Sequence, residues 1–175
     1  MIGASASGKS TIAKLTVGVW KPISGTVRLD GADVYTWNRV EFGKYVGYLP
    51  QDIELFNAPI KVNIARMNPN PEPALVVEAA KVAGIHDMIL SLPSGYDTII
   101  GGAGGVILSG GQKQLLGLAR AFYGGIKLLV LDEPNANLDG NGEYNLIKAL
   151  HYAKTKKITV KVKLYLTLKH VKPRL

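Results

Sequence analysis

Gly3-Ala4-Ser5-Ala6-Ser7-Gly8-Lys9-Ser10-Thr11 is the stretch of this sequence that decides its fold. It follows the pattern Gly-x4-Gly-Lys-Ser, in which glycines let backbone N–H groups close around phosphate oxygens. In such a loop Lys9 reaches the terminal phosphates and the hydroxyl of Ser10 can hold Mg²⁺. The stretch therefore predicts a nucleotide phosphate site, against the alternative of a merely flexible Gly/Ser terminus.

The residues after this loop have helical spacing. Ile12, Leu15, Val19 and Trp20 recur at intervals close to a helical turn, so the loop is expected at a helix N-terminus. The first N–H groups of a helix have no partner within it and carry partial positive charge, which suits an anion. The predicted helix strengthens the phosphate-site hypothesis.

Two adjacent acids follow an apolar run further along the chain. The run Lys127 to Leu131 (KLLVL) suits a parallel strand covered on both faces, and Asp132 and Glu133 come directly after it. Ligands of open α/β sheets bind at the carboxyl ends of the strands. There Asp132 can hold Mg²⁺ through water, and Glu133 can orient or deprotonate the water that attacks a γ-phosphate. The alternative is that the acids simply cap a strand at a turn.

Other segments indicate an α/β chain with a mainly parallel sheet and a small helical subdomain. Three segments have helical apolar spacing and two read as strands. The predicted helices are residues 73–83, 111–122 and 144–153, and the further predicted strands are residues 45–49 and 158–168.

Composition limits the classes of function. The 175 residues suit one domain, and no segment approaches the roughly 20 apolar residues of a membrane span. Without cysteine, a disulfide framework is excluded. The net charge of +8 is uneven: residues 1–147 hold 12 basic and 13 acidic side chains, whereas residues 148–175 hold nine basic ones and no acid. A basic tail can attract nucleic acid or anionic lipid, but it can equally be a solvated face.

Leu108-Ser109-Gly110-Gly111-Gln112, at the start of a predicted helix, resembles the signature sequence of ATP-binding cassette (ABC) proteins. The resemblance implies that Ser109, Gly110, Gly111 and Gln112 contact the γ-phosphate of ATP held by an opposite subunit. It implies a head-to-tail homodimer that encloses two nucleotides, with ATP and Mg²⁺ as cofactors. A monomer would then bind ATP but hydrolyse it poorly.

Two further positions resemble the same family. Gln51 is similar to the glutamine that contacts Mg²⁺ and senses the membrane domain, and Asp139 ends Asn137-Leu138-Asp139, which resembles the loop through which two active sites communicate. The 100-residue interval between Lys9 and Ser109 suits a transporter cassette and leaves no room for a long coiled coil. We therefore expect an ATPase domain over residues 1–153, with a helical subdomain at about 57–120 and an aberrant basic segment at 154–175.

The amino-acid sequences of residues 5–8, 47–56 and 133–139 resemble those of the ATPases of type I secretion. That resemblance implies a transmembrane exporter domain as partner, with a periplasmic adaptor and an outer-membrane channel beyond it. It also implies a peripheral position on the cytoplasmic face of a bacterial inner membrane, with no nucleic-acid partner. Residues 96–105 resemble the loop that touches the exporter's coupling helices, although Gly102 stands where an acid is usual.

The sequence departs from the family at both ends. It begins at the phosphate loop, so the first strands of the fold and an adenine-stacking aromatic are expected to be missing, as in an N-terminally truncated domain. His170 resembles the catalytic histidine switch, but Lys161 and Lys163 interrupt the strand before it, and burying them would be costly. Two alternatives stay open: a truncated, non-catalytic remnant, and a soluble ABC ATPase that acts on nucleic acid.

Overall fold

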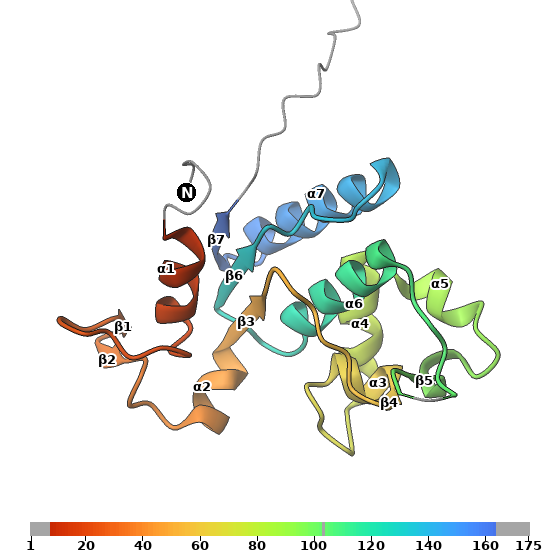
Figure 1. Cartoon of the computed structure of the whole chain (residues 1–175), viewed down its shortest axis with the longest axis horizontal. Helices are drawn as coiled ribbons and strands as arrows, with labels where there is room; N and C mark the ends of the chain where they lie inside the picture. The colour runs from red at the N-terminus through yellow and green to blue at the C-terminus, as the bar shows by residue number, and fades with distance from the viewer. Residues whose placement is uncertain (1–7, 103, 164–175) are drawn as a thin grey trace, which may run out of the picture.

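The computed structural model describes residues 8–102 and 104–163, and it confirms the predicted α/β fold (Figure 1). The helices are α1 Lys9–Thr16, α2 Arg39–Tyr45, α3 Ile60–Ile64, α4 Pro73–Ala83, α5 His86–Leu90, the 3₁₀ helix η1 Gly95–Asp97, α6 Gly110–Phe122 and α7 Gly140–Thr155. The strands are β1 Arg28–Leu29, β2 Ala32–Asp33, β3 Val46–Leu49, β4 Ala58–Pro59, β5 Ile99–Ile100, β6 Leu128–Asp132 and β7 Thr159–Lys163.

A parallel sheet of order β3-β6-β7 forms the centre of the described fold. All five residues of β6 are buried, as the apolar run predicts for a strand covered on both faces. In the register, Leu49 of β3 pairs with Leu131 of β6. The carboxyl ends of these two strands therefore meet at one edge of the sheet.

Each face of the sheet has its own apolar core. On one face, Ala13 and Val17 from the α1 region join Leu128 and Val130 of β6. On the other, Leu129 and Leu131 join a larger cluster contributed by α3, α4, α5, α6 and α7. Figure 1 shows α1 on one side of the strands and α4 and α6 on the other. Because β6 alternates its side chains between the two faces, it contributes to both cores.

The helix after the phosphate loop is shorter than its apolar spacing indicated. It ends at Thr16, and Gly18 follows in the left-handed region at φ 67°, where an added Cβ would lie 2.6 Å from the carbonyl oxygen of Val34. Ile12 is 43% exposed, whereas Lys9, Ala13, Thr16 and Val17 are buried. The predicted helix is confirmed, but packing against β6 selects a different face from the one that the largest side chains mark.

Several short elements escaped prediction from the sequence. The helix α2 is capped by Asn38, whose side-chain oxygen accepts hydrogen bonds from the N–H groups of Val40 and Glu41. An Asn followed three residues later by Glu is a recognised helix-start pattern, so this signal was present in the sequence. The two-residue pair β4–β5 is too short to leave a periodic pattern.

Lys161 lies on β7 and is exposed. The strand stands at the end of the order β3-β6-β7 within the described residues. The cost expected for a lysine buried inside a central strand therefore does not arise at this position. Within the two described ranges, no helix combines the length and the apolar character needed to cross a bilayer.

Candidate functional site

The carboxyl edge of the sheet carries the predicted glutamine and acids. Leu49 of β3 pairs with Leu131 of β6. Gln51 comes two residues after Leu49, and Asp132 comes directly after Leu131. Gln51 is exposed, whereas Asp132 is 1% exposed at the last position of β6. Parallel pairing thus brings side chains 81 positions apart in the sequence to one edge of the sheet.

Glu133 sits in an unusual backbone conformation immediately beyond this edge. Its φ is 54°, in the left-handed region that costs a non-glycine residue on the order of 1 kcal/mol or more. The buried amide of Gln114 donates hydrogen bonds to the carbonyl oxygens of Glu133 and Pro134, at 3.3 and 3.2 Å. Gln114 lies on α6, so the helix that follows the signature sequence also holds the turn that carries Glu133. Gln114 was not predicted from the sequence as a residue of the site. The signal that could have indicated it is a polar residue on the apolar face of α6.

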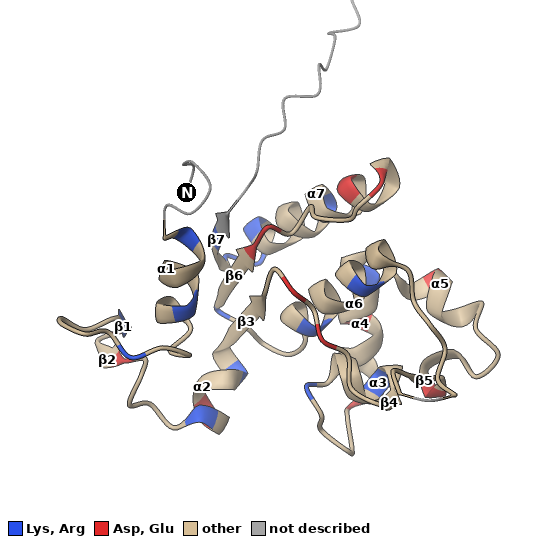
Figure 2. Cartoon of the chain, in the orientation of Figure 1, with Lys and Arg blue, Asp and Glu red and all other residues tan. Residues whose placement is uncertain are grey.

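The start of α1 supplies the basic part of the site. Gly8 caps the helix at φ 77°, a conformation that glycine adopts without strain, and Lys9 is only 6% exposed. The helix contacts β6 and begins toward the end of the sheet where β3 and β6 end (Figure 1). Figure 2 shows a basic first turn of α1 and acidic residues directly after β6. Gly3 to Ser7 lie outside the described residues; Gly8, Lys9, Ser10 and Thr11 open α1.

The signature sequence forms the start of α6 through a reciprocal cap. The N–H of Gln112 donates to Ser109 Oγ at 3.2 Å, and the N–H of Ser109 donates to Gln112 Oε1 at 2.9 Å. Both side chains are therefore engaged in holding the helix end that would face a phosphate. Their predicted contact with nucleotide stays a prediction.

The Asn137-Leu138-Asp139 loop packs against the two signature glycines. A Cβ added to Gly110 would lie 3.3 Å from Asn137 Cβ, and one added to Gly111 would lie 3.1 Å from the Asn137 carbonyl oxygen. Asn137 itself is left-handed at φ 61°. Asp139 caps α7, because its side chain accepts a hydrogen bond from the N–H of Gly142 at 2.8 Å. The space for a side chain is therefore tight at both signature positions, against the Asn137 side chain at Gly110 and against the Asn137 backbone at Gly111.

The predicted site residues form two groups within one chain. One group consists of the α1 start, Gln51, Asp132 and Glu133, and the other of the α6 start with the loop at residues 137–139. In Figure 1 the starts of α1 and α6 lie on opposite sides of the molecule. One chain does not bring Ser109 beside Lys9. The predicted histidine switch, His170, lies outside the described residues.

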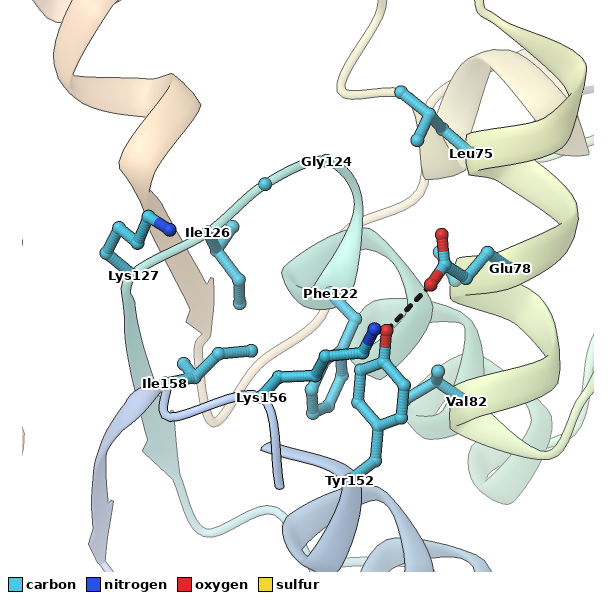
Figure 3. A pocket seen from close by; sticks show the side chains of 12 residues that line it. Leu75, Glu78, Val82, Phe122, Gly124, Ile126, Lys127, Tyr152, Lys156 and Ile158 are labelled. Atoms are coloured by element: carbon cyan, nitrogen blue, oxygen red, sulfur yellow. Dashed lines mark hydrogen bonds between the residues drawn. The ribbon is translucent and has the colours of Figure 1, made fainter. Parts of the chain in front are cut away.

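A hollow of about 260 Å³ lies apart from both groups, between α4, the connection from α6 to β6, and the end of α7. None of the predicted site residues lines it. Across it, the hydroxyl of Tyr152 donates a hydrogen bond to Glu78 Oε1 at 2.7 Å, which joins α7 to α4 (Figure 3). Burial, followed by this hydrogen bond and the charge of Glu78, raises the pKa of Tyr152 to about 12. The hollow is thus a structural junction between helices rather than part of the candidate site.

The three residues predicted to hold Mg²⁺ carry the donor chemistry of a hard-cation site. Ser10 supplies a hydroxyl, Gln51 an amide oxygen and Asp132 a carboxylate, and all are oxygen ligands of the kind that Mg²⁺ prefers. Mg²⁺ usually completes its coordination with water and substrate phosphates, so few protein ligands are needed.

An α/β fold in which the sequence motif Gly-x4-Gly-Lys-Ser ends in the first turn of a helix, with acids at the end of an adjacent buried strand, defines a phosphate-loop nucleotide-binding protein. Residues 1–136 match the family model described as ABC transporter. Because this match covers more than half of the 175 residues, the chain belongs to the ABC transporter family.

Individual relatives agree with this assignment. The chain is 52% identical over 150 residues to the type I secretion system ATP-binding protein PrsD of Rhizobium meliloti, covering 86% of this chain and 26% of that protein. It is 39% identical over 150 residues to an ATP-dependent lipid A-core flippase of Chromohalobacter salexigens, with the same two coverages. The structure of a bacterial Atm1-family ABC exporter with ATP bound aligns with TM-score 0.79 and 34% identity, over 95% of this chain and 29% of that chain. The chain thus spans between about a quarter and a third of the length of these relatives.

Proposed function

We propose that this chain is the ATP-hydrolysing part of an ABC exporter. The observation that carries the proposal is the register of β3 and β6: it pairs Leu49 with Leu131, two residues before Gln51 and directly before Asp132 and Glu133, in a sheet that α1 contacts. In the proposal, the loop from Gly3 to Thr11 binds the phosphates and Lys9 neutralises the terminal ones. Mg²⁺, held through Ser10, Gln51 and Asp132, supplies further neutralisation of phosphate charge.

Glu133 activates the water that attacks the γ-phosphorus. The water oxygen forms a bond to phosphorus, the bond from phosphorus to the bridging oxygen of ADP breaks, and Glu133 accepts the water proton. Phosphoryl transfer depends mainly on positioning and charge neutralisation, so the protein contributes geometry rather than covalent chemistry. The hydrogen bonds from Gln114 to the Glu133–Pro134 turn support this positioning role.

A second copy completes the site in this proposal. The separation of the α1 start from the α6 start supports a head-to-tail homodimer, in which Ser109, Gly110, Gly111 and Gln112 of the second copy approach the γ-phosphate. Asp139 and its loop then communicate between the two sites. We propose residues 1–153 as the ATPase domain, with its helical subdomain at about 57–120, and residues 154–175 as a basic segment that departs from the family.

The export role follows from the relatives. The 52% identity to a type I secretion ATP-binding protein favours protein secretion, and the flippase and exporter names of the other relatives favour transport over action on nucleic acid. The proposed partners are a transmembrane exporter domain, a periplasmic adaptor and an outer-membrane channel. The proposed location is the cytoplasmic face of a bacterial inner membrane.

The proposal is tested by ATPase assay of the purified chain and its Glu133→Gln variant. Loss of the general base lowers kcat by about 100-fold or more, while ATP binding persists. Glu143→Gln makes the same chemical change at an exposed position on the first turn of α7 and keeps normal turnover. Equal hydrolysis by the chain and by Glu133→Gln would favour the non-catalytic remnant, and a steeply salt-dependent affinity for DNA would favour the nucleic-acid alternative.

A further inference from the structure

Three polar side chains, one buried and two half-buried, connect the segment after Gln51 to the signature helix. Asn63 lies on α3, Arg66 follows it, and Arg120 lies near the end of α6. We call these three residues the arginine bracket. None of them belongs to the predicted nucleotide site, and the hydrogen bonds that they make are too many and too specific for a surface role.

Asn63 holds the chain just beyond Gln51. Its side chain is fully buried; Oδ1 accepts a hydrogen bond from the N–H of Phe56, and Nδ2 donates to the carbonyl oxygens of Phe56 and Ala58, at 3.0, 3.0 and 3.2 Å. Residues 56–58 are therefore fixed to α3 through one amide group.

Arg120 ties the same segment to α6. Its guanidinium donates to the carbonyl oxygen of Asn63 at 3.0 Å, to Asn63 Oδ1 at 2.9 Å and to the carbonyl oxygen of Glu54 at 2.9 Å. It also lies over the ring of Phe56. Burial lowers the pKa of Arg120. The planar fork of arginine makes these bonds simultaneously, which the single ammonium of lysine does not do.

Arg66 attaches this assembly to the start of β3. Its guanidinium donates to the carbonyl oxygens of Arg120, Ala121 and Tyr123 at the end of α6, and to those of Gly43 and Val46 next to β3. Arg66 and the following Met67 are both left-handed, at φ 57° and 65°, a strain that these bonds maintain. Burial, with a smaller effect of the Arg120 charge, lowers the pKa of Arg66 to about 10, so it stays cationic at neutral pH.

The signature lies at the other end of the same helix. The 13 residues of α6 extend over about 18 Å, at roughly 1.5 Å per residue. From the geometry we infer that the arginine bracket makes residues 51–58 and α6 move as one body, so that a displacement of Gln51 by nucleotide is passed to Ser109. This inference rests on the proposed function and makes Asn63, Arg66 and Arg120 positioning residues.

The test measures hydrogen exchange of the full chain in the Glu133→Gln background with and without ATP and Mg²⁺. Joint slowing of exchange in residues 50–57 and 109–122 is expected. Arg120→Lys keeps the response of 50–57 and loses that of 109–122. In the catalytically intact background, the same substitution lowers kcat by about tenfold while the Kd for ATP stays within about twofold.

Tyr152→Phe is the matched control. It breaks the hydrogen bond between α7 and α4 but does not touch residues 51–58. Both segments of this variant should still respond to ATP. A joint response that survives in Arg120→Lys, or that is lost equally in Tyr152→Phe, would overturn the inference.

If circular dichroism shows that Arg120→Lys does not fold, Asn63→Asp replaces it in the hydrogen-exchange test. It keeps an oxygen acceptor for Arg120 but removes the amide that donates to Phe56 and Ala58, so the same selective loss is expected. A retained joint response in this variant counts against the bracket.

A measurement without nucleotide separates this inference from the proposed function. The N–H of Phe56 bonds directly to Asn63 Oδ1, and Arg120→Lys should accelerate its exchange by about tenfold, whereas Tyr152→Phe should not. Absence of Glu133-dependent hydrolysis would overturn the proposed function alone. Unchanged exchange at Phe56 would overturn the bracket.

Discussion

Gln51, Asp132 and Glu133 are placed by strands, whereas Ser109 and Asp139 are placed by the starts of helices. The strand-placed group depends on the β3–β6 register and on close contact of β3 with the end of α6. The helix-placed group depends on local caps, in which the functional side chains bond to backbone a few residues away. The first group is therefore sensitive to distant packing changes, and the second tolerates any residue that still caps.

The largest expected effect on stability is at Gly47, in the strand β3 that leads to the strand-placed group. A Cβ at this position of β3 would lie 2.0 Å from the carbonyl oxygen of Ala121, so alanine forces β3 and α6 apart. Gly47→Ala should lower the free energy of unfolding by about 3 kcal/mol or more, as overpacking against backbone does.

Gly43→Ala provides the control for this prediction. Gly43 lies inside α2, and nothing stands within 4 Å of an added Cβ, so alanine there should leave stability unchanged or raise it by about 0.5–1 kcal/mol. Urea denaturation of both variants measures the difference. Equal stability of the two would show that the strand-placed group does not depend on this contact.

An intermediate effect is expected at Gln114, which joins the two groups. Gln114→Leu removes the donor to the carbonyl oxygens of Glu133 and Pro134 and should cost about 1–3 kcal/mol of stability. It should also lower kcat, because the strained turn that carries Glu133 loses a support. Stability loss at unchanged kcat, measured on the same preparation, would contradict the positioning role and leave a purely structural one.

The smallest effect on stability is expected at Ser109, and it separates capping from function. Ser109→Ala removes the cap of α6 and should cost about 1 kcal/mol. Ser109→Asp restores a capping oxygen, so stability should stay close to that of the original protein. Its charge would repel the γ-phosphate held by the second copy, so ATPase activity should fall further than in Ser109→Ala. Normal hydrolysis by Ser109→Asp would remove Ser109 from the proposed site.

The sequence predicted the elements whose signals are local and strong. Residues 73–83 form a helix with the bounds that the apolar spacing and Gly84 indicated, and the apolar run before Asp132 forms a buried strand. By contrast, Val19 and Trp20 lie beyond the end of α1 at Thr16, and Ile12 is exposed, because contact with β6 selects which side chains of α1 are buried. The predicted roles of the site residues, the domain bounds and His170 stay predictions.

By itself, the sequence determined the α/β class, the family resemblance and the residue types of the candidate site, because these depend on motifs and short-range periodicity. Tertiary structure alone decided that the strands before Gln51 and Asp132 pair in parallel, that Gln114 holds the turn of Glu133, and that Arg66 joins β3 to α6. These contacts join residues between 19 and 82 positions apart. No local pattern encodes them, because a buried polar group takes its partners from whatever backbone the packed fold brings near it.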